Sequence, residues 1–514
     1  MTVAAPYRKV GIWPRLLLPD LAAMLAASTL FFCVFVYGAG TAFFRDSDTG
    51  WHIRNGERIL AMHAVPHTDP FSFSKSGQPW FAWEWGADVL MGGVYRLSGL
   101  RGLTALFALA IAAGIWLCCR LHAAAGGDYV ILAWLVPLTV ITASVHWLAR
   151  PHVLGWVLLL AVLLYAERAP ARFGLRQFAL IAGGAALWSN LHASFFLGPL
   201  IFITYAAAHF IRPLIWPLKC DSEWLRARWF LWAVLASVAG SLLNPYGGRL
   251  HVHVFSFLTD TELTSRISEF QSFNFQQPVA PAMAAALGLA MAGGTLALSQ
   301  KKLAHALLIA VFVWAGLRSG RALPLVALAA LPLANGAFAE ALHDARGLRR
   351  ELQRALERAL AYSARLGALD RNFNGAVFLA GAGVLALLPL TSPAWSGKIG
   401  FPAQRFPVAA TSALEKLPSD ARVLASDSFG GYLIYRFDGA RQVYIDGRSD
   451  FYGAAFLKQY LDLMSARPGW RHIVDSFHFT HALLPSDSTL LAALEQAGWA
   501  ILYQDDVATL LETR

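Results

Sequence analysis

The chain has 514 residues, of which 57% are hydrophobic and only 14% are charged, and its formal net charge is +10. A soluble domain keeps about a quarter of its residues charged, so this composition excludes a purely soluble protein and indicates a surface that faces lipid. Basic loops that hold a membrane protein in its orientation account for the positive charge without a nucleic-acid partner. The four cysteines lie in or near apolar stretches or in a basic loop, so no disulfide framework is expected.

The apolar stretches predict a polytopic α-helical membrane domain over residues 1–392. A helix crosses a bilayer with about 20 apolar residues, or roughly 17 when it is short. About 11 stretches approach this length, at residues 20–42, 102–121, 129–148, 152–167, 176–191, 194–211, 228–243, 280–298, 303–318, 321–339 and 373–391.

The basic residues of the short loops predict the orientation. With this number of spans, they all fall on one side, including the seven arginines of segment 340–372. The prediction requires that the apolar segment 83–97 lies in the outer interface and does not cross. We therefore expect a bacterial inner-membrane protein with a cytoplasmic N-terminus. Segment 340–372 is predicted to be an amphipathic helix on anionic lipid, with a docking helix for a partner as the alternative.

Residues 393–514 have the composition of a soluble domain and are expected in the periplasm. Short β-like runs alternate with helical patterns, which predicts a small α/β domain. The predicted strands are 422–426, 442–446, 481–484, 500–503 and 507–511, and the predicted helices are 408–417, 453–466 and 488–497.

The first outer loop, residues 43–101, is dense in polar groups, and Asp46 and Asp48 stand directly after the first span. Two neighbouring carboxylates repel each other and are costly to desolvate. A metal ion, a basic neighbour or a reacting hydroxyl would give the pair a function. The alternative is a plain Asp pair that caps a helix starting near Gly50.

Further polar groups lie at the outer ends of spans, where the positive-inside rule predicts few arginines. They include Arg150, His152, His192, Arg318 and Arg321. Arg318 and Arg321 are three residues apart, so a helical turn would place both on one face, and paired guanidinium groups suit a phosphate. The alternative is that each side chain extends separately to lipid headgroups.

Several motifs occur together in one order. An acidic Asp46-Ser-Asp48 motif follows the first span, and two interfacial helices follow it, at Trp51–Leu60 and from Trp83-Glu84-Trp85 to near Gly99. A basic, proline-containing segment, Arg318-Ser-Gly-Arg321-Ala-Leu-Pro324, opens a late span. This layout, over residues 15–340, resembles the GT-C glycosyltransferases, the membrane class that uses polyprenyl-phosphate sugars, near its protein mannosyltransferase-like and aminoarabinose-transferase-like members.

Some features depart from those members. Their adjacent Asp-Glu pair is absent, and the spaced Asp-x-Asp is closer to the metal-using oligosaccharyltransferase-like pattern, although no clear second acidic motif is seen. Glu84 replaces the basic-and-proline motif that often opens the second interfacial helix. The run Gly430–Tyr435 with Val443–Arg448 also resembles a set of bacterial membrane proteins that share this whole layout.

The resemblance implies transfer of a sugar, with inversion, from a polyprenyl-phosphate donor to an unidentified glycan, lipid or protein acceptor on the periplasmic face. Asp48 is then the candidate base, and Asp46 is its partner or, with Asp48, a ligand of Mg²⁺ or Mn²⁺. The candidate phosphate ligands are Arg318, Arg321, Arg150, His152 and His192.

The candidate acceptor-binding residues are Glu84, Asp446 and Arg448. Asp446-Gly447-Arg448 follows a predicted strand, and an ordinary Asp-Gly turn is the alternative for it. Three other functions remain open: a transporter or flippase, a non-catalytic assembly protein for envelope polysaccharide, and an O-antigen-ligase-like enzyme. The spans are nearly free of charge and the polar groups gather at their outer ends, which favours interfacial chemistry over permeation.

Overall fold

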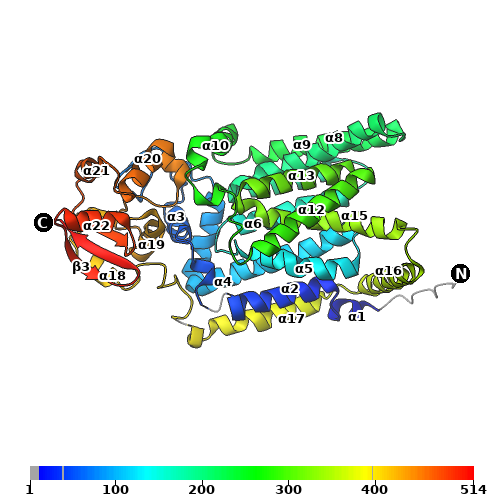
Figure 1. Cartoon of the computed structure of the whole chain (residues 1–514), viewed down its shortest axis with the longest axis horizontal. Helices are drawn as coiled ribbons and strands as arrows, with labels where there is room; N and C mark the ends of the chain where they lie inside the picture. Colours follow the sequence, from blue (N-terminus) through cyan, green and yellow to red (C-terminus); the bar gives the residue numbers. More distant parts are fainter. Residues whose placement is uncertain (1–10, 38–39, 396, 514) are drawn as a thin grey trace.

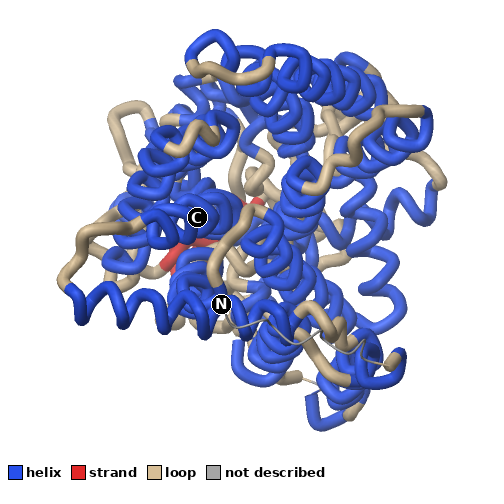
Figure 2. The backbone as a smooth tube through the Cα atoms, turned by 90° about the vertical axis from the view of Figure 1, so that its right-hand side faces the viewer, coloured by secondary structure: helices blue, strands red, loops and turns tan. Residues whose placement is uncertain are grey.

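Apolar helices make up most of the chain, which a computed structural model describes for residues 11–37, 40–395 and 397–513. They form a bundle with a small domain at one end (Figure 1). Among the described residues, this domain contains the only strands. We call this end the domain end, and the opposite end, where α1 and α16 lie, the far end. Viewed from the far end, the strands are seen only behind the helices (Figure 2).

The bundle helices follow the apolar runs of the sequence. They are α1 (Ile12–Leu17), α2 (Leu21–Phe32), α5 (Tyr129–Ser144), α6 (His152–Glu167), α7 (Leu175–Leu191), α8 (Leu197–Ile215), α9 (Cys220–Ser241), α12 (Ala280–Ser299), α13 (Leu303–Arg318), α14 (Leu323–Leu325), α15 (Leu331–Asp344) and α17 (Ala376–Leu387), with the second half of α4 (Trp85–Ala124) among them. At the domain end lie α3 (Asp48–Met62), α10 (Gly248–Thr259) and α11 (Thr261–Thr264).

A helix overlaps each of the predicted spans, but the helices differ from those spans in length. In the described part of the chain, five helical stretches are long and apolar enough to cross a membrane: Ile12–Tyr37, Trp85–Ala124, Ala193–Ile215, Ala280–Ser299 and Gly320–Asp344. Shorter apolar helices are α5, α6, α13 and Ala376–Thr391. The chain is therefore a multi-pass membrane protein, and the number of about 11 spans stays a prediction.

Gly99 divides α4 into two helices. Its φ of 59° and ψ of −153° are not helical, and a residue without Cβ adopts them readily. The first half lies crosswise at the domain end, while the second half runs within the bundle (Figure 1). The helix predicted for segment 83–97 is present as this first half.

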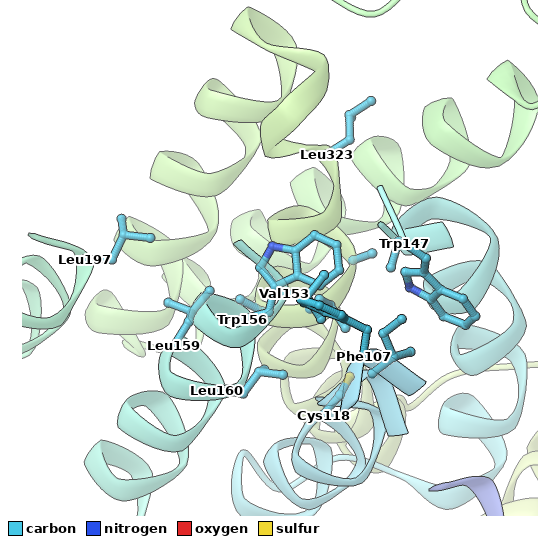
Figure 3. Packing of buried hydrophobic residues seen from close by; sticks show 14 of the residues in the cluster. Phe107, Cys118, Trp147, Val153, Trp156, Leu159, Leu160, Leu197 and Leu323 are labelled. Atoms are coloured by element: carbon cyan, nitrogen blue, oxygen red, sulfur yellow. The ribbon is translucent and has the colours of Figure 1, made fainter. Parts of the chain in front are cut away.

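The bundle core consists of apolar side chains from helices distant in sequence. Phe107 and Cys118 of α4 meet Val153 and Trp156 of α6 and, near the end of α5, Trp147 (Figure 3). All five are buried. Close packing of this kind holds helices together where lipid removes most of the hydrophobic driving force.

Segment 340–372 is not one continuous helix. α15 continues to Asp344, the chain then leaves helical geometry, and α16 (Arg350–Asp370) begins a new amphipathic helix. α16 is mostly exposed, and Ser363 and Gly367 are its buried contacts; the Ser363 hydroxyl accepts from the amide of Tyr129.

The C-terminal domain has a four-stranded sheet in the order β1 (Val423–Ala425), β2 (His481–Pro485), β4 (Ala508–Glu512), β3 (Ala500–Gln504). β1 and β2 are parallel and the other pairs antiparallel. Helices α18 (Thr411–Leu414), α19 (Asp427–Arg436), α20 (Ser449–Met464), α21 (Trp470–Ser476) and α22 (Thr489–Gln496) complete it. The predicted α/β domain is present.

The strand predicted at 442–446 is wrong. Val443 forms an isolated parallel bridge with Ser72 of the first loop: its amide donates to the Phe71 carbonyl at 2.9 Å, and its carbonyl accepts from Phe73 at 3.0 Å. The segment has the apolar composition of a strand because it is buried, but its backbone pairs with the membrane domain and not with the sheet.

Candidate functional site

α3 is held at backbone contact on two sides. A Cβ at Gly50 would collide with the carbonyl of Gly431 in α19, and one at Gly56 would collide with the carbonyl of Asp88 in α4. Only glycine permits helices to approach so closely. Because Asp48 is the first residue of α3, these contacts fix its position between the bundle and the C-terminal domain.

Five charged residues form what we call the carboxylate cluster. Arg150, between α5 and α6, contacts Asp46 Oδ2, Asp48 Oδ2 and Glu269 Oε1, each at 2.8 Å. The other Glu269 oxygen pairs with Arg321 Nη1 at 3.1 Å. The Asp48 amide donates to Asp46 Oδ1 at 2.9 Å, which keeps the two aspartates in one arrangement.

The carboxylate cluster has a buried side and an open side. Side-chain exposure is 10% for Asp48 and 11% for Arg150, and it rises to 20% for Asp46, 25% for Glu269 and 30% for Arg321. A ligand would therefore reach the cluster past Glu269 and Arg321, with Asp48 at the inner wall.

Asp48 and Glu269 of the carboxylate cluster differ in their pKa. Burial raises the pKa of Asp48 to about 7, against the opposing effect of Arg150 and with support from the neighbouring Asp46, Glu269 and Asp446. Burial also opposes ionisation of Glu269, but Arg150 and Arg321 outweigh it and lower the pKa of Glu269 to about 2. Near pH 7 Asp48 can exchange a proton while Glu269 stays ionised.

A second group of acids and histidines begins at His52. This residue follows Asp48 by four positions in α3, so it lies one helical turn away. Asp88 Oδ1 contacts His52 Nδ1 at 2.6 Å, and Glu84 lies between His52 Nε2 at 3.7 Å and His192 Nε2 at 3.4 Å. Burial lowers the pKa of His52 to about 3 and raises that of Glu84, so we expect a neutral imidazole beside a readily protonated carboxyl group.

Each imidazole ring has one bonded nitrogen and one that faces Glu84. His52 Nδ1 shares a hydrogen bond of 2.6 Å with Asp88 Oδ1, and its Nε2 faces Glu84. His192 Nδ1 accepts from the Ser194 amide at 3.1 Å, so its Nε2 carries the proton and faces Glu84. Within the described residues, neither Nε2 atom has a hydrogen-bond partner although both are buried. Beside Glu84, these two nitrogens can therefore each form a further hydrogen bond.

The structure brings together most of the residues that the sequence singled out. Arg150 contacts Asp46 and Asp48 directly, and Glu269 joins Arg321 to Arg150. His152 lies beside His192, with ring centroids 6.5 Å apart. His152 Nε2 donates to the His146 carbonyl at 2.9 Å, so that nitrogen is already occupied.

Arg318 does not join the carboxylate cluster. It is exposed and lies over the ring of Trp314 at 5.9 Å. The predicted helical turn through both arginines is wrong, because α13 ends at Arg318 and Ser319 is extended, with φ −142° and ψ 127°. This break turns Arg321 toward Glu269 and leaves Arg318 on the outside.

Asp446 and Arg448 form a buried brace between the C-terminal domain and the first loop. Arg448 contacts Asp446 through two nitrogens, at 2.8 and 2.6 Å, and pairs with Asp69 at 2.8 Å. Its guanidinium lies 4.6 Å from the ring centre of Trp80. As placed, these charged groups hold the domain on the loop, and their role in acceptor binding stays a prediction.

The residue between them, Gly447, lies against the carboxylate of Asp48. A Cβ at Gly447 would overlap Asp48 Oδ1. We therefore predict that Gly447→Ala pushes Asp48 away from Arg150 and lowers activity at least tenfold, while the unfolding temperature changes little because a side-chain tip, and not backbone, is displaced. Activity and thermal unfolding of the purified variant check this.

Gly431→Ala is the matched comparison. Its Cβ would collide with the backbone carbonyl of Ser47, whereas the Cβ at Gly447 would collide with a side chain. It should lower the unfolding temperature as well as activity. Full activity in Gly447→Ala would contradict the proposed position of Asp48.

The acids of the carboxylate cluster have the oxygen donors that Mg²⁺ and Mn²⁺ prefer. They are nevertheless each bonded to Arg150, and within the described ranges no three His, Cys, Asp or Glu side chains are gathered so that they could hold an ion. In this arrangement the guanidinium occupies the position that such an ion would need.

Three residues of the site, Glu269, Asp88 and His52, were not assigned a role from sequence. Glu269 is 119 residues from Arg150 and 52 from Arg321, and Asp88 is 36 residues from His52. No local spacing connects such pairs. The one available signal was that Glu269 is a carboxylate in an outer loop that also follows a span.

No protein-family model matches the sequence, and no curated protein is significantly similar to it. Among solved structures, the archaeal oligosaccharyltransferase AglB from Archaeoglobus fulgidus, in complex with an inhibitory peptide and a dolichol-phosphate, is similar at a TM-score of 0.57 and 13% identity. The match covers 90% of this chain and 69% of that one. The apo form of the Archaeoglobus fulgidus enzyme is similar at a TM-score of 0.55 and 14% identity, with the same coverage. The GT-C resemblance of the motifs is thus confirmed at the level of the fold.

Proposed function

We propose that the chain is a membrane glycosyltransferase that moves a sugar from a polyprenyl-phosphate donor to an acceptor at the domain end. The observation that carries the proposal is the carboxylate cluster itself. It combines an acid whose pKa lies near 7 with two arginines, Arg150 beside that acid and Arg321 at the open edge, on a GT-C fold. That the similar AglB structure holds a dolichol-phosphate supports a lipid-phosphate donor.

In the proposed reaction, Asp48 accepts the proton of the acceptor hydroxyl. The hydroxyl oxygen attacks the anomeric carbon of the sugar, the bond from that carbon to the phosphate oxygen breaks, and the electron pair leaves with polyprenyl phosphate. One displacement inverts the anomeric configuration. Oδ1 of Asp48 is the atom for this step, because Oδ2 is bonded to Arg150. A base works best when its pKa is near the working pH.

The departing phosphate needs cations, which Arg321 and Arg150 supply. Arg321 is the more exposed of the two and shares Glu269 with Arg150, so a phosphate can replace part of that contact. Glu84, with the two unoccupied histidine nitrogens, is the proposed acceptor-binding group.

Two further parts of the proposal concern the side of the membrane on which the site lies and the need for a metal ion. We infer that the domain end faces the periplasm of a bacterial inner membrane, because the basic loops then lie in the cytoplasm. A requirement for Mg²⁺ or Mn²⁺ would need Arg150 to withdraw from the three acids, so the mechanism above contains no step at a metal ion.

The proposal is tested by comparing the variants Arg321→Ala and Arg318→Ala. The two residues are three apart, but only Arg321 belongs to the carboxylate cluster, through its ion pair with Glu269. In proteoliposomes with a defined polyprenyl-phosphate sugar, release of polyprenyl phosphate should fall about tenfold to a hundredfold in Arg321→Ala, as expected for loss of a charged hydrogen bond. Arg318→Ala should retain the wild-type rate.

Equal loss in both variants would assign the effect to surface charge and contradict the specific role of Arg321. Wild-type protein that releases no polyprenyl phosphate from any such donor would overturn the donor class and leave the transporter, flippase and assembly functions open. Thermal unfolding of both variants controls for misfolding.

A further inference from the structure

A second polar site lies at the far end of the bundle. A partly open cavity of about 210 Å³ lies where α6 and α8 end and where α9 and α13 begin. α6 has His152 at its other end, beside the proposed active site, so the length of the bundle separates the two sites. None of the residues of this cavity takes part in the proposed transfer reaction.

Two acids, Glu167 in the lining of the cavity and Glu223 outside the lining, already have partners. Glu223 accepts from His209 Nδ1 at 2.8 Å and from Arg212 Nη1 at 3.1 Å. Glu167 accepts from His305 Nε2 at 2.9 Å and from the Tyr205 hydroxyl. Against these two acids the lining contains three cations, Arg212, Arg226 and Lys302.

Several donors at the cavity lack an anion. Arg226 donates only to the carbonyls of Ala169 and Pro170, at 3.4 and 3.0 Å, and forms no ion pair with a described residue. Arg212 Nε is buried and has no hydrogen-bond partner in the described chain. Lys302 pairs with Glu340, which lies outside the lining. Buried donors without acceptors are costly, so the site is suited to an added anion with several oxygens.

Exposed apolar residues beside the cavity indicate that such an anion is part of a lipid. Phe210 and Leu214 of α8 and Trp224 and Leu225 of α9 are exposed beside the cavity. In a membrane, acyl chains cover apolar residues of this kind, and tryptophan is typical of the headgroup level. Basic pockets between transmembrane helices bind anionic headgroups.

We propose that this cavity binds the phosphate of an anionic membrane lipid, with the diester phosphate at Arg226 and Arg212 and the acyl chains along the exposed faces of α8 and α9. The recognised chemistry is a phosphate group, which a lipid or free phosphate can supply. The site belongs to the far end and does not depend on the proposed transferase activity.

The test is a titration of the full-length protein in neutral detergent with short-chain phosphatidylglycerol, read as the shift in unfolding temperature. Phosphatidylcholine and inorganic phosphate are parallel probes. Arg226→Ala should need at least ten times more phosphatidylglycerol for the same shift. Arg172→Ala, an exposed arginine at the same end, should behave as wild type. Arg212→Lys, which keeps the charge but lacks the Nε donor, should also bind more weakly and serves if Arg226→Ala does not fold.

Stabilisation by phosphatidylglycerol alone supports a lipid site, and an equal shift with inorganic phosphate supports a phosphate site supplied from solution. The proposal is overturned if neither probe shifts the wild-type protein, if phosphatidylcholine acts as strongly, or if Arg226→Ala and Arg172→Ala respond alike.

Discussion

Asp48→Asn should reduce sugar transfer by about 10²- to 10⁴-fold, the usual contribution of a general base. The amide keeps the size of the side chain but cannot take the acceptor proton. Because burial places the pKa of Asp48 at about 7, the carboxylate form is lost as the pH falls through 7, so the wild-type rate should fall below that pH. The rate–pH profile of Asp48→Asn should lack this step.

The measurement is transfer from a polyprenyl-phosphate sugar by reconstituted protein over a range of pH, with thermal unfolding as the check on folding. Asp221→Asn, an exposed aspartate at the far end, is the matched control and should keep the wild-type rate and profile. A folded Asp48→Asn variant with full transfer would remove Asp48 as the base. If cells that carry it also made normal envelope polysaccharide, a structural role of the acidic loop would explain the data better.

Arg150→Ala should have the largest effect on stability. Removing one partner of a buried ion pair costs about 3–5 kcal/mol, and here one guanidinium contacts three acids at 2.8 Å. The free energy of unfolding should fall by about that amount, and transfer should be lost. Arg150→Lys should recover only part of either property, because a point charge cannot bridge several carboxylates as a planar fork does.

Thermal unfolding in detergent measures the effect, and Arg318→Ala, outside the carboxylate cluster, is the control. The variant also tests the three acids as ligands, because without Arg150 they are left without a central cation. Stabilisation of Arg150→Ala by Mn²⁺, but not of wild-type protein, would indicate that the guanidinium takes the place of a divalent ion. An unchanged unfolding temperature in Arg150→Ala would contradict the ion contacts on which the site rests.

The domain end also explains why the C-terminal domain matters to a site in the first loop. Gly431 allows α19 to touch α3, and Gly447 lies on Asp48 itself. The brace of Asp446, Arg448 and Asp69 keeps this contact in place. We therefore expect a chain without the domain to lose the position of Asp48 even where the bundle remains folded.

The sequence by itself determined where the helices lie, because apolar length and helical period are local properties. It located the helix that becomes the first half of α4, the amphipathic pattern of α16 and most strands of the α/β domain. It also singled out Asp46 and Asp48, since two acids directly after a span stand out against apolar surroundings.

Only the tertiary structure decided which charges meet. Arg150, Glu269 and Arg321 come from three separate loops, and their contacts depend on how the helices pack. The same holds for Val443, whose backbone pairs with the first loop in place of the predicted strand partners. Arg318 and Arg321 are a further example, because the extended backbone at Ser319 separates them and they point in different directions. Hydropathy records whether a segment is buried, whereas an ion pair or a backbone bridge depends on the neighbour that folding brings to it.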